Sequence, residues 1–364
     1  MNKRISRICS LYATLALALG MTVAQAAANG RASDMMNRGN DDAVIATVVQ
    51  SSKAYHRASE DVVIQVSFTN TSDAAVTMPQ WLFDADDVDR SFLKVTRDGS
   101  PVTYTAALVK RAAPTADELV VLSPGESRSA KYELSSAFDL GEGGIYAVSF
   151  VGAAQNAMTA QARESGSIVI GVEADPFRSL VGAVDYQKAA GAGGVSYTGR
   201  CTASEKSSLV TALTDAEVYA GNAVTYLSGT PSATTRYTTW FGTFSTANWN
   251  TVKDHFTNIR SVYNTNAIVF DCGCSKKNTY AYVYPSQPYK IYLCGAFWSA
   301  PATGTDSKAG TLVHETSHFT AVAGTQDYAY GQSAAKALAL SNPAQAIMNA
   351  DSHEYFAENT PAQP

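Results

Sequence analysis

Residues 314–318 read His-Glu-Thr-Ser-His, and this stretch follows the partly apolar lead-in Ala309–Val313. On a helix, positions i and i+4 lie on one face, so the side chains of His314 and His318 can both reach one Zn²⁺ ion. Glu315 would lie beside that ion without binding it, in place to take a proton from the attacking water. The alternative is two ordinary histidines on a helix, but the whole chain contains only five histidines. The pattern therefore predicts a helix at about 307–322 that carries half of a zinc peptidase site.

The third zinc ligand has to come from outside this helix, because catalytic zinc usually has three protein ligands and keeps a fourth position for water. Phe319–Ala323 offers neither the glycine nor the third histidine that a metzincin places after its second histidine. The downstream candidates are Asp327, Glu354 and Glu358. Glycines at 324 and 331 flank Asp327 and permit a tight turn back toward the metal. Spacing therefore favours Asp327, and a helical glutamate such as Glu354 is the alternative.

The sequence around the motif predicts an α+β domain over 188–364. The expected helices are 203–228, 246–262, 331–340 and 344–357, and the expected strands are 267–270, 279–284 and 290–293. A small sheet packed on the motif helix, with further helices after it, is typical of a zincin-like metallopeptidase. The strand at 279–284 is a candidate edge strand that would hold an extended substrate by strand addition.

The N-terminal half has a different pattern, made of short runs with β character separated by turn signals. The expected strands are 44–49, 62–68, 92–96, 102–109, 129–134, 145–150 and 167–172. About seven short strands predict an antiparallel β-sandwich of immunoglobulin-like architecture over 27–187. The small-residue, Gly-rich stretch 187–199 then indicates an exposed linker before the second domain.

Composition and charge narrow the class of protein. The 364 residues are 46% hydrophobic and 16% charged, which predicts packed globular units. A net charge of −5 gives no support to nucleic-acid binding. The acidic excess lies before residue 188, which favours two separate units.

The N-terminus is typical of a secretion signal. Lys3, Arg4 and Arg7 form a positive end, 11–23 is an apolar run, and Ala24-Gln25-Ala26 is a small-x-small cleavage site. A membrane anchor that stays in place is the alternative, but the apolar run is short for a bilayer. We therefore expect a signal peptide at 1–26 and a secreted protein with no membrane contact after its removal.

Four cysteines follow the signal, and all lie in the C-terminal half: Cys201, Cys272, Cys274 and Cys294. An exported protein meets an oxidising environment, so two structural disulfides are expected. Four cysteines allow three pairings, and their spacing does not choose among them. A metal site at 272–274 is the alternative, although the spacing does not match a zinc ribbon.

The segments 308–331 and 349–356 resemble the aspzincin (deuterolysin) family, and are closest to its peptidyl-Lys metalloendopeptidase branch. Shorter matching pieces are 236–242, 282–285 and 293–298. The resemblance covers about 196–364 and does not extend into the β-rich half. It implies one Zn²⁺ bound by His314, His318 and Asp327, with Glu315 as general base. It also implies disulfides Cys201–Cys272 and Cys274–Cys294.

Three further residues receive a role from the same resemblance. It implies that Tyr330 stabilises the oxyanion or donates a proton, whereas a structural tyrosine is the ordinary interpretation in a chain with 19 tyrosines. It implies that Asp351 and Glu354 line the pocket for the side chain just after the scissile bond, where two carboxylates would pair with a lysine ammonium. Helix capping is the ordinary interpretation of an Asp-x-x-Glu pattern.

Together these patterns predict a secreted zinc metalloendopeptidase that cuts proteins and peptides, and the family resemblance implies that it cuts on the amino side of lysine. The β-rich segment has no catalytic constellation, so we expect a propeptide that assists folding or masks the cleft. It contains no cysteine, which excludes a cysteine-to-zinc latch. The Gln187–Lys188 bond is a candidate for self-cleavage. The alternatives are an aspzincin of broader specificity and a secreted binding module whose zinc is structural.

Overall fold

The computed structural model describes residues 45–364 apart from 59, 85–88, 153–164 and 175–193, and these belong to one compact unit. The expected signal peptide at 1–26, the expected boundary between 187 and 188, and the Gln187–Lys188 bond lie outside the described residues. Within the described ranges, no helix is both long and apolar enough to cross a membrane.

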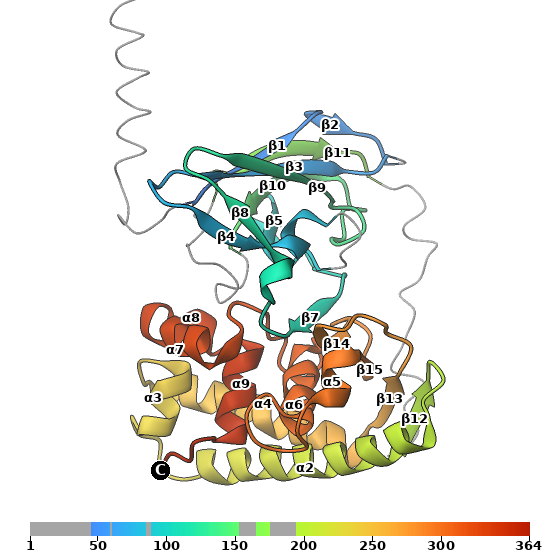
Figure 1. Ribbon diagram of the computed structural model, residues 1–364, viewed down its shortest axis with the longest axis vertical. Coiled ribbons are helices and arrows are strands. Elements are labelled where there is room, and N and C mark those ends of the chain that lie inside the picture. The colour runs from blue at the N-terminus through green and yellow to red at the C-terminus, as the bar shows by residue number, and fades with distance from the viewer. Residues whose placement is uncertain (1–44, 59, 85–88, 153–164, 175–193) are drawn as a thin grey trace, which may run out of the picture. The chain divides into compact units, whose positions relative to one another are not determined.

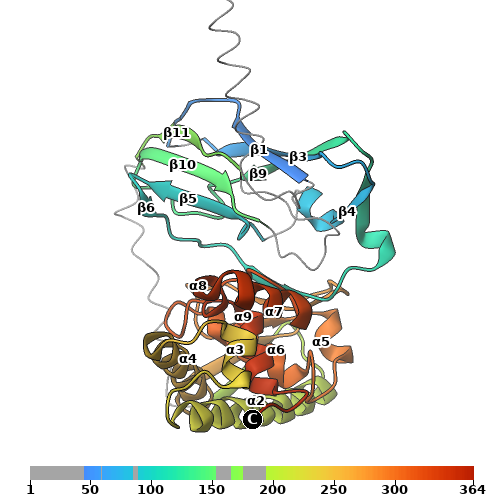
Figure 2. The ribbon, with the colours of Figure 1, turned by 90° about the vertical axis from the view of Figure 1, so that its left-hand side faces the viewer.

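Short strands between residues 45 and 172 form the β-rich segment (Figures 1 and 2). One sheet has the order β1-β3-β9 and consists of β1 (Ile45–Ser51), β3 (Val63–Asn70) and β9 (Ser127–Glu133). A second has the order β2-β11-β10-β5-β6, from β2 (Tyr55–His56), β11 (Ile168–Val172), β10 (Gly144–Phe150), β5 (Leu93–Arg97) and β6 (Ser100–Pro101). Strands β4 (Val76–Pro79) and β8 (Leu119–Leu122) form a two-stranded ribbon.

One apolar cluster joins these strands. In β3, alternate side chains are buried, among them Ile64, Val66 and Phe68, because successive residues of a strand point to opposite faces. The ring of Phe68 meets that of Phe150 from β10 edge-on, with 5.3 Å between centroids. The β-rich character expected from the sequence is therefore present in the structure, while an immunoglobulin-like topology stays a prediction.

Strand β7 (Leu108–Arg111) departs from the sequence expectation, which placed one strand at 102–109 within the β-rich segment. The strand begins later and pairs antiparallel with β14 (Thr279–Val283), a strand of the C-terminal half. Edge strands carry unpaired backbone donors and acceptors, and β7 satisfies those of β14. The expectation was wrong because strand pairing of this kind depends on a partner about 170 residues away.

The C-terminal sheet has the order β12-β13-β15-β14-β7. Its other strands are β12 (Gly194–Thr198), β13 (Ala267–Asp271) and β15 (Lys290–Leu293). Pairing is parallel between β12 and β13 and between β13 and β15, and antiparallel between β15 and β14. Residues 194–198, expected as part of the linker, are thus a strand; their β-branched and aromatic side chains suit the pleated edge of β13.

Helices cover this sheet and carry a second apolar cluster. They are α2 (Ala203–Leu227), α3 (Thr235–Phe241), α4 (Thr246–Thr265), α5 (Gly295–Ser299), α6 (Lys308–His318), α7 (Gly331–Ser341), α8 (Pro343–Ala346) and α9 (Ala350–Glu358). Helix α2 packs against α4, α6 and α9 (Figures 1 and 2) through a buried stripe of Leu209, Ala212, Ala216, Ala220, Ala223 and Leu227. The three- and four-residue spacing puts these small side chains on one face and allows close approach.

Two helix boundaries differ from the sequence expectation. The motif helix ends at His318 rather than near 322, because Phe319 leaves helical geometry with φ −57° and ψ 127°. The expected helix at 344–357 is two helices, α8 and α9, because Asn349 is extended between them.

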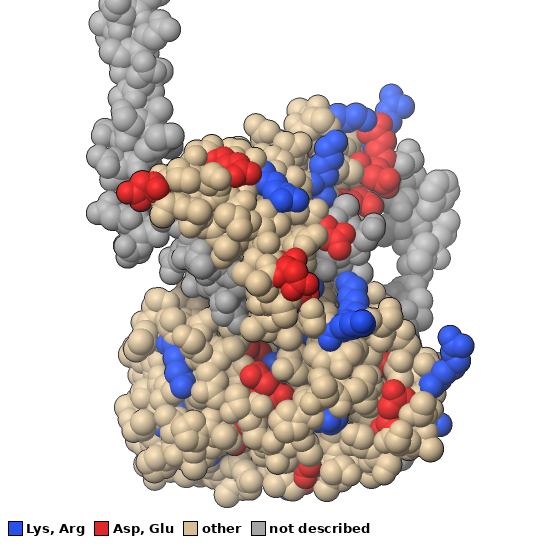
Figure 3. All heavy atoms as spheres, in the orientation of Figure 1, with Lys and Arg blue, Asp and Glu red and all other residues tan. Residues whose placement is uncertain are grey.

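Both disulfides implied by the family resemblance are present, Cys201–Cys272 and Cys274–Cys294. They tie the chain just before α2 and the chain just before α5 to the segment after β13. On the face drawn in Figure 3, acidic and basic side chains lie interspersed among larger uncharged areas.

Candidate active site

Helix α6 is the element that positions the motif, and its residues 309–318 are all buried. It begins after Ser307, whose side chain caps the helix by accepting from the Gly310 amide at 2.9 Å. Glu358 of α9 in turn accepts from the Ser307 amide at 2.9 Å. A Cβ on Gly310 would lie only 2.1 Å from Glu358 Oε1, so glycine is needed where α6 and α9 pack together. This close packing places His314 beside the first turn of α9.

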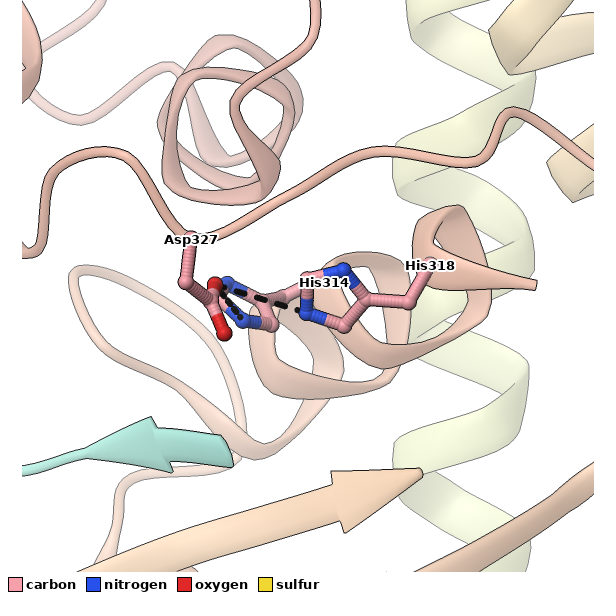
Figure 4. Close-up of side chains that lie close together, drawn as sticks. All are labelled: His314, His318 and Asp327. Atoms are coloured by element: carbon pink, nitrogen blue, oxygen red, sulfur yellow. Dashed lines mark ion pairs between the residues drawn. The ribbon is translucent and has the colours of Figure 1, made fainter. Parts of the chain in front are cut away.

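His314, His318 and Asp327 converge from two segments, as Figure 4 shows. The Nε2 atoms of His314 and His318 lie 3.2 Å and 3.4 Å from the same oxygen, Oδ1 of Asp327. Asp327 comes from the loop between α6 and α7, and this loop is tied to the start of α9. The side chain of Asn349 accepts there from the amides of Tyr328 and Ala329 at 2.9 Å and 3.0 Å.

The other ring nitrogens fix the tautomers of the two histidines. His318 Nδ1 lies 2.9 Å from the carbonyl oxygen of Thr325, so Nδ1 carries the proton and Nε2 keeps its lone pair. His314 Nδ1 lies 2.7 Å from the carboxylate oxygen Oδ1 of Asp351, and this negative charge favours a proton on Nδ1 there too. A carboxylate or carbonyl behind a histidine is the usual support for a metal ligand.

The donor set fits a zinc ion. Within the described residues, both Nε2 atoms and both carboxylate oxygens of Asp327 are buried without a hydrogen-bond partner, which would be costly unless an ion satisfied them. Two imidazoles and one carboxylate are ligands that zinc accepts, with one position left for water. Burial alone would raise the pKa of Asp327, but the two histidines hold it well below its usual range, so the carboxylate is ionised.

Glu315 is fully buried beside this cluster, and its carboxylate has no hydrogen-bond partner among the described residues. Burial raises the pKa of Glu315 to about 7, against the opposing effect of the two histidines. A carboxylate with a pKa near neutrality can take up a proton and release it again.

Tyr330 immediately precedes α7, and its hydroxyl donates to the carbonyl oxygen of Val109. Its ring stacks on that of His314 with 6.5 Å between centroids. Burial raises the pKa of Tyr330 well above its usual value, so its hydroxyl stays a donor. The hydroxyl therefore points at a backbone carbonyl while the ring lies against His314.

Asp351 and Glu354 lie in the first turn and a half of α9 and are 1% and 0% exposed. The residue that precedes this helix is Asn349, so Asp351 does not occupy the cap position and the capping interpretation is not supported. Instead, Glu354 Oε2 lies 2.7 Å from Nζ of Lys110, and Asp351 Oδ1 lies 3.4 Å from it. Glu354 Oε2 lies 3.3 Å from Nδ1 of His314, on the side of the ring away from Nε2. Glu354 therefore does not reach the point on which the Nε2 atoms of His314 and His318 converge.

His314, Asp351 and Glu354 also come close enough together to suggest a second metal position. The ammonium of Lys110 already supplies a positive charge there, which makes a second cation at that point unfavourable.

Sequence reasoning missed several residues of this region. Lys110 and Asn349 have no local signal, because their roles depend on contacts with distant segments. Glu358 was considered only as a metal ligand, whereas it supports the start of α6. Tyr280 was also missed, and its ring centroid lies 5.1 Å from the Lys110 ammonium.

Comparisons with known proteins agree with this geometry. A family model described as Aspzincin, lysine-specific metallo-endopeptidase, matches residues 226–358. The chain is 41% identical to an extracellular protease of Aeromonas hydrophila, over 84% of this chain and 90% of that protein. It is 39% identical to the peptidyl-Lys metalloendopeptidase of Armillaria mellea, over 84% of this chain and 89% of that protein. The peptidyl-Lys metalloendopeptidase of Pleurotus ostreatus is 58% identical over 44% of this chain and 96% of its own length.

The first two of these similarities correct one expectation. The resemblance was expected to cover only about 196–364, but alignments over 84% of the chain extend well into the β-rich segment. The β-rich segment is therefore shared with relatives rather than peculiar to this chain. On the strength of these similarities the chain belongs to the aspzincin family and is a zinc metalloendopeptidase.

Proposed function

We propose that this enzyme is secreted, that it cuts peptide bonds on the amino side of lysine, and that it is made as an inactive precursor. The observation that carries the lysine specificity is the pair of buried carboxylates of Asp351 and Glu354, which we call the lysine pocket. A lysine side chain of the chain itself lies in it, with Nζ 2.7 Å from Glu354 Oε2.

The proposed chemistry follows from the arrangement of the side chains. When bound by His314, His318 and Asp327, zinc would supply a Lewis acid for the substrate carbonyl and the attacking water. Glu315 would accept a proton from that water and pass it to the leaving amine. The Tyr330 hydroxyl would donate a hydrogen bond to the carbonyl oxygen as negative charge develops there.

The pocket favours lysine for two reasons. Two buried carboxylates that face no cation would be costly, so a side chain that brings an ammonium is strongly preferred over a neutral one. The ammonium of such a lysine would also lie near two aromatic rings; the ring centroids of Tyr280 and Tyr355 are 5.1 Å and 5.9 Å from the ammonium of Lys110.

Secretion is supported by the two disulfides, which form in oxidising compartments, and by the similarity to a protein described as an extracellular protease. In this proposal, 1–26 is the signal peptide, 27–187 the propeptide, with an immunoglobulin-like sandwich, and 188–364 the catalytic domain. The propeptide would mask the cleft or assist folding.

Cleavage-site mapping on a denatured protein, with and without a chelator, tests the proposed specificity. Nearly all cuts should precede lysine, and the chelator should abolish them. Glu354→Gln keeps the size of the side chain but removes its charge, so it should flatten the lysine preference while the metal content stays unchanged. Cuts without lysine preference in the unaltered enzyme would favour the broader-specificity alternative.

The alternative of a binding module with structural zinc makes a different prediction for Glu315. In the proposed enzyme, Glu315→Gln should lower the hydrolysis rate by about 10²–10⁴-fold while zinc stays bound. A structural zinc site usually has four protein ligands and has no need of this carboxylate. Unchanged hydrolysis in Glu315→Gln would reject the proposed role of the residue.

Self-processing at Gln187–Lys188 is part of the proposal and is tested separately. N-terminal sequencing of the mature protein from wild type and Glu315→Gln decides the matter. Identical processing in the inactive variant would show that another protease makes the cut.

A further inference from the structure

We propose that strand β7, Leu108–Arg111, fills the substrate cleft of the unprocessed chain as a substrate would, with Lys110 as the residue that closes the lysine pocket. This inference rests on the proposed function, because it identifies the Asp351–Glu354 pocket with the subsite for substrate lysine. It adds the identity of the inhibitory segment and of its decisive side chain.

The first support is the backbone pairing of β7. It lies antiparallel beside β14, with Leu108 opposite Val283 and Val109 opposite Tyr282 (Figure 1). The pairing continues beyond the strand, where the Ala112 amide donates to the carbonyl oxygen of Asn278 at 2.9 Å. Without β7, β14 would be the edge of the C-terminal sheet, the kind of edge to which an extended peptide adds as a further strand.

The second support is the burial of Lys110. A lysine is rarely buried without compensation, yet the side chain of Lys110 is only 2% exposed. Its ammonium faces Glu354 and Asp351, and Asp306 Oδ1 is 3.7 Å away. These carboxylates belong to the C-terminal half, whereas Lys110 belongs to the β-rich segment. The ammonium of Lys110 thus lies among carboxylates that come about 200 residues or more later in the chain.

The third support is the carbonyl that precedes this lysine. The carbonyl oxygen of Val109 accepts a hydrogen bond from the hydroxyl of Tyr330. In the proposed mechanism, the same hydroxyl donates to the substrate carbonyl. Val109 and Lys110 therefore present a carbonyl to Tyr330 and an ammonium to the acidic pocket at the same time. An X–Lys bond of a substrate would present the same two groups.

The fourth support is the anchoring of β7 at both ends to the β-rich segment. Before the strand, the Tyr104 hydroxyl donates to the Ala107 carbonyl at 2.9 Å. Within it, the Arg111 guanidinium lies over the ring of Trp81, 4.4 Å from the centroid. A tethered segment has a high effective concentration at its site, so it competes with free substrate even when its intrinsic affinity is modest.

The test uses the full chain in a Glu315→Gln background, which prevents self-processing. Binding of a short fluorescent peptide with a single lysine is followed by anisotropy in the zinc-loaded protein. Lys110→Ala removes the ammonium, and Lys110→Glu adds a carboxylate that the pocket repels. The matched control is Lys131→Ala, an exposed lysine on β9.

Both Lys110 variants should bind the peptide at least about tenfold more tightly than the background chain, because the open cleft is then a larger fraction of the population. Lys131→Ala should bind like the background. Circular dichroism and metal content would show that each variant is folded. If neither Lys110 variant binds more tightly than the background, Lys110 does not close the pocket and the inference is overturned.

A second peptide, with norleucine in place of lysine, separates this inference from the proposed specificity. If the Lys110 variants bind both peptides equally well, β7 closes the cleft but the pocket does not select lysine, and the proposed specificity fails. If the background chain already binds the lysine peptide as tightly as the variants do, and every chain binds the norleucine peptide more weakly, the specificity stands and the occlusion is wrong.

Discussion

Two pairs of buried histidines lie in the helical half of this protein, and they differ in what faces their nitrogens. His255 and His353 bind each other, with Nδ1 of the first 3.0 Å from Nε2 of the second. His314 and His318 instead direct both Nε2 atoms at one carboxylate oxygen of Asp327 without hydrogen-bonding to it. The comparison shows that burial of a histidine is not by itself evidence that it binds a metal.

The contacts of the remaining ring nitrogens explain this difference between the two pairs. His353 Nδ1 lies 2.9 Å from the carbonyl oxygen of Asn349, so Nδ1 carries the proton and Nε2 accepts a hydrogen bond from His255 Nδ1–H. Every polar atom of His353 is then used within the protein. In the other pair, His318 Nδ1 donates to the carbonyl oxygen of Thr325 and His314 Nδ1 faces the carboxylate of Asp351, which leaves the two Nε2 lone pairs free for a metal. The first pair is structural, and the second is a candidate metal site.

Removing one member of each pair gives the largest contrast. His318→Ala should lose both the bound metal and the hydrolytic activity, because two remaining protein ligands hold zinc poorly. His255→Asn keeps a side-chain N–H for His353 and should retain metal and activity. Metal per chain after dialysis, together with peptide hydrolysis, checks both. Loss of metal in His255→Asn would remove the distinction between the pairs.

The partner of His314 Nδ1 gives a smaller effect. Asp351→Asn keeps an oxygen near Nδ1 but removes the negative charge, so the imidazole becomes a weaker ligand. Loss of such a supporting carboxylate typically lowers metal affinity by about 10–100-fold. Competition with a chromogenic chelator measures the affinity. The matched control is Glu358→Gln, a buried acidic residue of the same helix that contacts Ser307 and not the histidines; equal affinities in the two variants would contradict the prediction.

The sequence predicted one pair and not the other for a physical reason. His314 and His318 are one helical turn apart, so a local pattern reveals them. His255 and His353 lie on α4 and α9, 98 residues apart, and only packing of the two helices brings them together. Asp327 was predictable because flanking glycines and a short distance along the chain restrict where its side chain can reach.

The same distinction applies to the fold. Helices α2 and α4 begin where the periodicity of the sequence placed them, since amphipathic spacing is a local property. Strand β7 was assigned to the wrong sheet, because Leu108 and Val109 are apolar in any sheet and only the free edge of β14 decides their partner. Lys110 was overlooked for the same reason: nothing near it in the sequence indicates three distant carboxylates.

The structural pair should affect stability rather than metal binding. His353→Phe keeps a ring in the cluster, where the rings of Phe241 and Phe256 have centroids 5.3 Å and 5.4 Å away. It leaves the His255 N–H without an acceptor, which should lower the free energy of unfolding by about 1–3 kcal/mol. Urea unfolding of the metal-free proteins measures this. A variant as stable as wild type, or one that no longer takes up zinc, would show that the pair is not structural.

The smallest expected effect is a pH dependence of stability that the structural pair causes. Burial lowers the pKa of His255 to about 4, and burial together with the neighbouring His255 lowers that of His353 to about 3. Both have an unfolded value near 6.5, so as pH falls below 6.5 the unfolded chain takes up protons that the folded chain refuses. The stability is therefore fully present above pH 6.5 and declines below it, by up to about 1.4 kcal/mol per pH unit for each histidine.

His255→Asn removes one titrating group and should make the decline between pH 6.5 and 5 shallower, as urea unfolding of metal-free wild type and variant at several pH values would show. Parallel curves of stability against pH for wild type and variant would mean that the decline comes from other groups, such as the metal-free His314–His318 pair. The two pairs would then differ less in their protonation than their contacts indicate.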